Sequence, residues 1–155
     1  MNPRVEAVRR LLRDAGALGE VRLLPEKAHT AALAAEQLGV EVGQIANSLI
    51  FDADGSPVLV MTSGRHRVDT DKVARLLGIP ALRRADAQFV RVHTSQAIGG
   101  VAPVGHPEPI GTLVDIELAR YDVVWAAAGH PSTVFPTTYA ELLRITSGTA
   151  AEVGA

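Results

Sequence analysis

Cysteine is absent from this 155-residue sequence, and lysine and aromatic residues are scarce. Without cysteine, the chain can form no disulfide bond, no thiolate zinc site and no cysteine nucleophile. Aromatic residues make up 4% of the chain, with Trp125 as the only tryptophan, and Lys27 and Lys72 are the only lysines. Histidine occurs five times, but no two histidines have the i, i+4 spacing of a helical zinc pair. We therefore predict no metal site.

Long apolar runs are missing as well. No run approaches the ~18 residues that cross a membrane, and the first residues lack the apolar core of a signal peptide. We expect a cytoplasmic protein that does not bind membranes. The sequence also lacks a G-x-S-x-G elbow, a P-loop and a G-x-G-x-x-G motif, which argues against hydrolase-triad, NTPase and dinucleotide-binding functions. No cofactor is predicted.

Charge is nearly balanced overall but uneven along the chain. The net charge of −2 gives no global nucleic-acid signature. Residues 65–91 carry seven arginine or lysine side chains against three aspartates, whereas residues 108–122 are acidic. This asymmetry predicts one basic face. The Arg65-His66-Arg67 run is either a solvated surface or a phosphate contact.

The order of helices and strands predicts a mixed-sheet α+β fold. With 47% hydrophobic and 21% charged residues, the chain has the composition of one compact domain, which we place at residues 1–146, with a flexible tail at 147–155. Helices are expected over residues 3–15, 31–38, 70–77, 85–93 and 139–145. Strands are expected over residues 21–24, 44–51, 58–62, 110–116, 123–128 and 133–135. These elements interleave without a regular βαβ series.

Three polar or glycine-rich features stand out within this apolar framework. The segment from Ser95 to Gly111 contains four glycines and three prolines, and its composition is that of a shaped loop. It is either a turn-rich connection or a row of free amides that binds a carbonyl or oxyanion. Asn47 lies on the more apolar face of its strand, either tied to the backbone or lining a pocket. Together with the Gly129-His130 turn, these features are typical of a small-molecule site.

Several motifs in one order resemble a known family. They are Thr30-Ala31-Ala32, Leu38-Gly39-Val40, residues 44–51, Thr62-Ser63-Gly64, Val68 to Lys72, Gly99 to His106, and Trp125 to Pro131. From about residue 20 to residue 146, the chain closely resembles the YbaK / prolyl-tRNA synthetase editing-domain family of trans-acting aminoacyl-tRNA deacylases. The resemblance implies a partly barrel-like sheet with flanking helices. It also implies hydrolysis of the ester that joins a wrong amino acid to the 3′ end of a tRNA.

The resemblance also implies which residues form the site. Those at the catalytic centre are Asn47, Gly99, Gly100, Val101, Ala102 and Pro103, and those around the substrate are Thr30, Ser63, Gly64, Gly129 and His130. The candidate tRNA contacts are Arg65, Arg67 and Lys72. The implied partners are the aminoacyl-adenosine end of a mischarged tRNA and, transiently, a synthetase. The sequence makes no prediction of oligomeric state.

Asn47 departs from the family, which has a lysine at this position of the central strand. An amide offers neutral donors and an acceptor but not the full positive charge of an ammonium. Three functions therefore remain open: a deacylase that works through loop amides, a non-catalytic binder of aminoacyl-tRNA or of a small aminoacyl or nucleotide ligand, and an enzyme acting on another ester or amide with His106 or His130 as general base.

Overall fold

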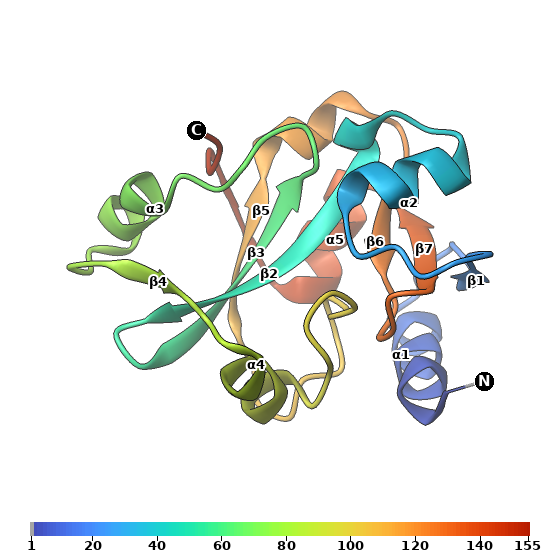
Figure 1. Ribbon diagram of the computed structural model, residues 1–155, viewed down its shortest axis with the longest axis horizontal. Coiled ribbons are helices and arrows are strands. Elements are labelled where there is room, and N and C mark those ends of the chain that lie inside the picture. The colour runs from blue at the N-terminus through green and yellow to red at the C-terminus, as the bar shows by residue number, and fades with distance from the viewer. Residues whose placement is uncertain (1) are drawn as a thin grey trace.

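The computed structural model describes residues 2–155 as one mixed eight-stranded sheet with helices on both faces (Figure 1). The strand order is β1-β7-β6-β2-β3-β5-β8, and β4 pairs with β2 outside this path. The helices are α1 (Pro3–Asp14), α2 (Ala31–Leu38), α3 (Thr70–Leu77), α4 (Ala87–Thr94) and α5 (Tyr139–Thr146), with short 3₁₀ turns η1 (Val42–Gln44) and η2 (Ile116–Arg120). The strands are β1 (Arg22–Leu23), β2 (Ile45–Ala53), β3 (Ser56–Ser63), β4 (Leu82–Arg84), β5 (Gly111–Asp115), β6 (Val124–Ala127), β7 (Thr133–Thr137) and β8 (Thr149–Ala151). The predicted α+β class is confirmed.

Local capping chemistry explains where the helices begin and end. The side chains of Thr30, Asp69 and Thr138 each accept a hydrogen bond from a backbone N–H in the first turn of α2, α3 and α5. Gly39 and Gly78 end α2 and α3 in the left-handed conformation, which glycine adopts without steric cost. None of the helices among residues 2–155 combines the length and apolar character needed to cross a membrane.

The β2–β3 hairpin forms the centre of the sheet. Its turn residues Asp54 and Gly55 both have positive φ, which matches the right-handed twist of the flanking strands. The two strands pair antiparallel along their whole length, from Ala46 opposite Ser63 to Ala53 opposite Ser56. The hairpin therefore supplies a rigid platform for the segments that cross it.

The other edge of β2 is shared by two strands and is open between them. β6 pairs with Ile45 and Ala46, whereas β4 pairs with residues 51–53. Residues 47–50 consequently have a strand neighbour on the β3 side only. The sequence analysis missed β4, because three residues are too few to show an alternating pattern.

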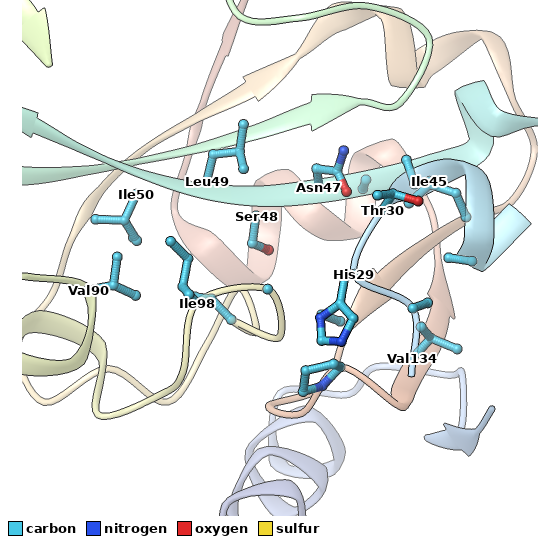
Figure 2. Close-up of a pocket in the computed structure, with 18 of the residues that line it drawn as sticks. His29, Thr30, Ile45, Asn47, Ser48, Leu49, Ile50, Val90, Ile98 and Val134 are labelled. Atoms are coloured by element: carbon cyan, nitrogen blue, oxygen red, sulfur yellow. The ribbon is translucent and has the colours of Figure 1, made fainter. Parts of the chain in front are cut away.

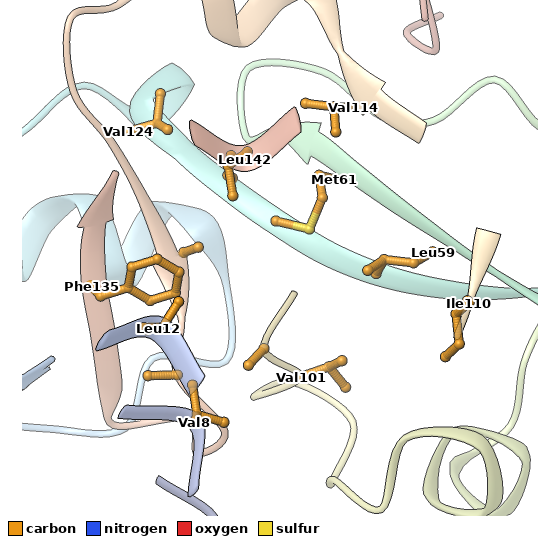
Figure 3. Packing of buried hydrophobic residues seen from close by; sticks show 14 of the residues in the cluster. Val8, Leu12, Leu59, Met61, Val101, Ile110, Val114, Val124, Phe135 and Leu142 are labelled. Carbon is orange, nitrogen blue, oxygen red and sulfur yellow. The ribbon is translucent and has the colours of Figure 1, made fainter. Parts of the chain in front are cut away.

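The largest cluster of buried side chains lies on one face of the sheet (Figure 3). It joins residues of β2 and β3 to α1, α4 and α5, with Phe135 and Met61 fully buried. In α4, Val90 and not Val92 faces the core. Val92 is 64% exposed, whereas Val90 is 1% exposed. The other face is covered by α2 and by α3 in two smaller clusters.

The C-terminal residues, expected to form a flexible tail, include a short strand and a buried side chain. β8 runs parallel to β5, and Val153 is fully buried beside α3 residues. The backbone N–H of Asp69 donates to the carbonyl of Val153. Small residues such as Ala150 and Ala151 carry no strand signal of their own, so only pairing with β5 defines the strand.

Candidate functional site

A cavity of about 240 Å³ occupies the gap in the sheet beside the open edge of β2 (Figure 2). Its walls come mainly from residues 45–51 of β2, residues 28–31 before and at the start of α2, residues 84–85 at the end of β4, the loop residues Ile98, Gly99 and Val101, and the turn into β7. Four segments distant in sequence therefore meet against one strand. This volume suits a small group rather than a drug-sized ligand, which typically needs ~300–1,000 Å³.

The backbone of Ser48 faces this gap without a strand partner. The carbonyl of Ile45 accepts a hydrogen bond from the N–H of Gly64, which lies on the β3 side. Because alternate residues of a strand direct their N–H and C=O to opposite edges, those of Ala46, Ser48 and Ile50 point the other way. On that edge, β6 pairs with Ala46, and β4 pairs with β2 only at residues 51–53. Ser48 therefore offers one donor and one acceptor to a ligand.

The side chains of β2 divide between the two sides of the strand. Ser48 and Ile50 point toward Val90 and Ile98, whereas Asn47 and Leu49 point to the opposite side (Figure 2). Asn47 is partly buried and makes no side-chain hydrogen bond within residues 2–155. Two interpretations of Asn47 were open, a core amide tied to the backbone and a residue that lines a pocket. Its place in the cavity lining supports the second.

The glycine- and proline-rich loop is held from behind by a buried glutamine. Gln96 is 2% exposed, and its amide donates to the carbonyl of Val104 (3.2 Å) while its Oε1 accepts from the N–H of Ala102 (2.7 Å). Thr94 accepts from the N–H of Gln96 and donates to the carbonyl of Val90 at the end of α4. These bonds connect the loop to α4 and restrict its conformation.

His106 adds a second support on the same side of the loop. Its Nε2 lies 2.9 Å from the carbonyl oxygen of Ala102. Burial lowers the pKa of His106, although the bond to this carbonyl opposes the shift. The ring is thus neutral at pH 7 and donates from Nε2, the only role that this nitrogen can take toward a carbonyl.

Gly100 lies against the backbone of the turn before β7. Its carbonyl accepts from the N–H of Gly129 (3.0 Å). A Cβ atom at Gly100 would lie 2.6 Å from the carbonyl carbon of His130 and 2.7 Å from the nitrogen of Pro131. Only glycine allows this approach. The contact fixes the loop relative to the opposite wall of the cavity.

Among Gly99, Gly100 and Val101 of the loop, two backbone amides have no acceptor within residues 2–155. The N–H of Gly100 donates to the carbonyl of Ala97, which closes a turn in the loop. Within residues 2–155, the N–H groups of Gly99 and Val101 have no protein acceptor, and both residues line the cavity. Free amides in a rigid loop are the usual means of binding a carbonyl or oxyanion.

The structure brings together some of the residues expected at the site and separates others. Asn47, Gly99, Val101 and Thr30 line the cavity. Gly100, Ala102, Pro103, Gly129 and His130 lie outside its lining, where they belong to the loop and the turn that shape it. The Nδ1 of His130 accepts from the N–H of Ser132. Neither His106 nor His130 lines the cavity, so the geometry does not support either one as a general base there.

Ser63 ends β3 in a buried polar cluster, and Gly64 follows it. Neither residue lines the cavity, although Gly64 lies close to Ala31, which does. Ser63 is fully buried and donates from Oγ to the carbonyl of Gly43 (2.8 Å). Its N–H donates to Asp115 (2.9 Å), which also contacts Nε2 of His66 (2.5 Å). Gly64 lies close to the backbone of Val42. These contacts connect β3 to η1 and η2.

The expected tRNA contacts are partly occupied by the protein itself. Lys72 donates to the carbonyl of Gly154 (2.6 Å) and lies 3.6 Å from Glu152. Arg65 lies 3.5 Å from Glu117. These two residues and Arg67 are absent from the cavity lining. No group of three or more acidic or histidine side chains arranged for a metal ion occurs among residues 2–155.

Sequence reasoning missed most of the cavity wall, including the polar residues His29, Ser48 and Arg84 and the apolar Ile98. His29 projects from the segment before α2, and a Cβ at Gly99 would lie 3.9 Å from its Nδ1. Ser48 belongs to the predicted strand, but only the register of β4 and β6 shows that its backbone is open. No local pattern marks Arg84, because its position depends on the unpredicted β4.

The chain is similar to several known proteins. Residues 25–145 match the aminoacyl-tRNA editing domain family. The chain is 33% identical over 110 residues to the uncharacterized protein YwhH of Bacillus subtilis, covering 70% of this chain and 69% of YwhH. It is 34% identical over 110 residues to the proline–tRNA ligase of Limosilactobacillus fermentum, covering 65% of this chain but 19% of that enzyme.

A solved structure matches over the whole chain. That structure is of a protein proposed to be a trans-editing enzyme for prolyl-tRNA synthetase. It superposes on the present chain with a TM-score of 0.93 at 40% sequence identity, and the match covers 100% of the present chain and 99% of the solved one. The residues matched by the family include β2, the glycine- and proline-rich loop and the turn before β7, which together build the cavity. The chain therefore belongs to the aminoacyl-tRNA editing domain family.

Proposed function

We propose that this chain hydrolyses the ester between a wrongly attached amino acid and the 3′-terminal adenosine of a tRNA, acting in trans. The observation that carries the proposal is the pair of free amides at Gly99 and Val101 beside the open backbone edge of Ser48. Family membership supports the reaction class. The need for such an enzyme is physical, since a synthetase gains only ~1–3 kcal/mol of discrimination from one methylene.

The cavity supplies complementary groups for an aminoacyl ester. The free loop amides would donate to the ester carbonyl, whose oxygen gains negative charge as water adds to the carbon. The carbonyl of Ser48 would accept a hydrogen bond from the α-ammonium group. Apolar side chains such as Ile50, Val90 and Ile98 would surround the amino-acid side chain. The new C–O bond forms from water, the bond to the ribose oxygen breaks, and that oxygen receives the proton.

His29 is the only histidine of the cavity wall, among the residues that the structure describes, and its imidazole can accept a proton. It lies beside Gly99, whose free amide would bind the ester carbonyl, so a water held by His29 would be close to the ester. We assign it the role of accepting the water proton. Asn47, on the other side of β2, would orient the adenosine through its amide, without contributing charge.

The test is a deacylation screen over a panel of tRNAs, each carrying a different wrong amino acid. We expect at least one member to lose its amino acid about 10²-fold faster than without enzyme. This factor is the typical contribution of one oxyanion-hole donor to the rate. A panel with no turnover above the spontaneous rate at high enzyme concentration would overturn the proposal.

A non-catalytic binder is the second candidate, and one observation favours it. No hydroxyl in the cavity wall is hydrogen-bonded to a base within residues 2–155: Ser48 contacts Met61, Thr30 caps α2, and Thr133 donates to a carbonyl. The same screen with Asn47→Lys separates the candidates. Binding without turnover in the natural protein, with hydrolysis only in Asn47→Lys, would identify a binder. Turnover in the natural protein would exclude that function.

A further inference from the structure

Arg84 carries the only formal charge in the cavity wall, as far as residues 2–155 define it. Every other side chain in the lining is apolar, an amide, a hydroxyl or an imidazole. Arg84 is exposed, and no carboxylate lies within ion-pair distance of it in the described chain. A single cation without a partner at the wall of an otherwise uncharged cavity indicates that the ligand brings its own negative charge.

The register of β4 determines which side of the sheet Arg84 occupies. Arg84 is opposite Phe51 in the antiparallel ladder. Directly opposite residues share a face, and residues two apart along a strand share it too, so Arg84 lies on the same face as Phe51, Leu49 and Asn47. Leu82, two residues earlier, is buried on this face against α3. Arg84 thus sits where β4 ends and the open edge of β2 begins.

The preceding residue provides an internal comparison. Arg83 is opposite Asp52 and therefore points to the other face. It lines a separate hollow together with Asp52 and Asp54, away from the cavity. Arg83 and Arg84 are thus adjacent, exposed and equally charged, yet only Arg84 reaches the cavity wall.

We propose that Arg84 is a substrate-binding residue that holds the 5′-phosphate of the terminal adenosine of the tRNA while the aminoacyl group occupies the cavity. This inference rests on the proposed function. A guanidinium suits this role, because its planar donors bind phosphate oxygens in pairs and it is always charged. The contact lies at the β4 end of the cavity, whereas the free amides of Gly99 and Val101 bind the ester. Arg84 thereby positions the ester against the loop rather than taking part in the proton transfers.

The test uses two small substrates that differ only in the phosphate. One is adenosine with an amino acid esterified at its 3′ position, and the other is the same compound with a 5′-phosphate. We expect the natural protein to bind and hydrolyse the phosphorylated compound about 10-fold better in kcat/KM, with the difference in KM. Arg84→Ala should lose this preference, because its kcat/KM for the phosphorylated compound falls toward that for the unphosphorylated one. Arg83→Ala, the matched control, should keep the preference within about twofold. These factors correspond to one charge-assisted contact.

Salt dependence gives a readout that does not require turnover. The probe is a tRNA whose amino acid is joined through a non-hydrolysable 3′-amide, and its binding is followed by fluorescence anisotropy at increasing KCl. Arg84→Ala should reduce the slope of log K against log [KCl] by about 0.7, the value for one phosphate contact on a single strand. Arg83→Ala should leave the slope unchanged, and Arg84→Lys should restore it, because it keeps the charge.

The outcomes separate the two proposals. If the natural protein hydrolyses the ester but Arg84→Ala keeps both the preference and the slope, the Arg84 proposal is wrong and the proposed function stands. If Arg84→Ala lowers kcat/KM equally for both small substrates, Arg84 only supports the fold, which also overturns the proposal. If the natural protein neither binds nor hydrolyses any of these compounds, the proposed function and the Arg84 inference both fail.

Discussion

Replacing Gly100 with alanine is expected to lower the deacylation rate about 100-fold without unfolding the protein. The added Cβ would lie within 2.8 Å of backbone atoms of His130 and Pro131, which cannot move aside as a flexible side chain would. The loop must therefore shift away from the turn, and with it the free amides of Gly99 and Val101. Misplacing catalytic groups by about 1 Å typically costs ~10²-fold in rate. The measurement is kcat/KM for the best tRNA of the panel.

Gly111 provides the matched control for this substitution. It lies at the other end of the same glycine- and proline-rich segment, where β5 begins, and a Cβ there would meet no atom within 4 Å. Gly111→Ala should keep its activity within about twofold. Thermal unfolding of both variants checks that the loss in Gly100→Ala occurs in folded protein. Full activity in Gly100→Ala would show that the loop position does not govern hydrolysis.

Removal of the Asp115 carboxylate is expected to give the largest loss of stability in the chain. Asp115 is 1% exposed and accepts hydrogen bonds from Thr62 (3.3 Å) and from the N–H groups of Ser63 (2.9 Å) and Glu117 (3.0 Å), besides its contact with His66. Asp115→Ala leaves these buried donors without an acceptor. We expect a decrease of about 3–5 kcal/mol in the free energy of unfolding, measured by urea denaturation.

Asp122→Ala is the control for the loss of one negative charge. Asp122 is exposed and forms no ion pair in the described part of the chain, so its removal should change the free energy of unfolding by less than about 0.5 kcal/mol. Equal decreases in the free energy of unfolding at Asp115 and Asp122 would mean that the buried hydrogen bonds of Asp115 add no stability beyond the effect of one charge. A large effect at Asp115 would also support a structural role for Ser63, since this network holds its backbone and lies away from the cavity.

Local signals in the sequence predicted most of the fold, because they act over a few residues. Capping side chains such as Thr30 and Asp69, and the Asp54-Gly55 turn, define the ends of elements without help from distant segments. β4 and β8 were missed for the opposite reason. Three-residue strands have no periodicity, and both exist only because β2 and β5 offer them an edge.

The candidate site was predictable only in part for the same reason. The glycine- and proline-rich loop was identified from its composition, and the motif resemblance pointed to Asn47. Sequence could not show that Gly100 approaches the turn before β7, since that contact joins residues about 30 positions apart. Nor could it distinguish Arg84 from Arg83, because the difference lies in the register of a strand that no pattern predicts.

The central claim is that the cavity beside the open edge of β2 holds the aminoacyl end of the substrate. Nuclear magnetic resonance of isoleucine methyl groups tests it most directly, with a non-hydrolysable 3′-aminoacylamino adenosine as the ligand. Ile45, Ile50 and Ile98 line the cavity. Ile79 packs beside α3, and Ile145 lies on α5. We predict that the ligand shifts the signals of Ile50 and Ile98 and leaves those of Ile79 and Ile145 in place. Shifts at Ile79 or Ile145 with no change at Ile50 and Ile98 would contradict the claim.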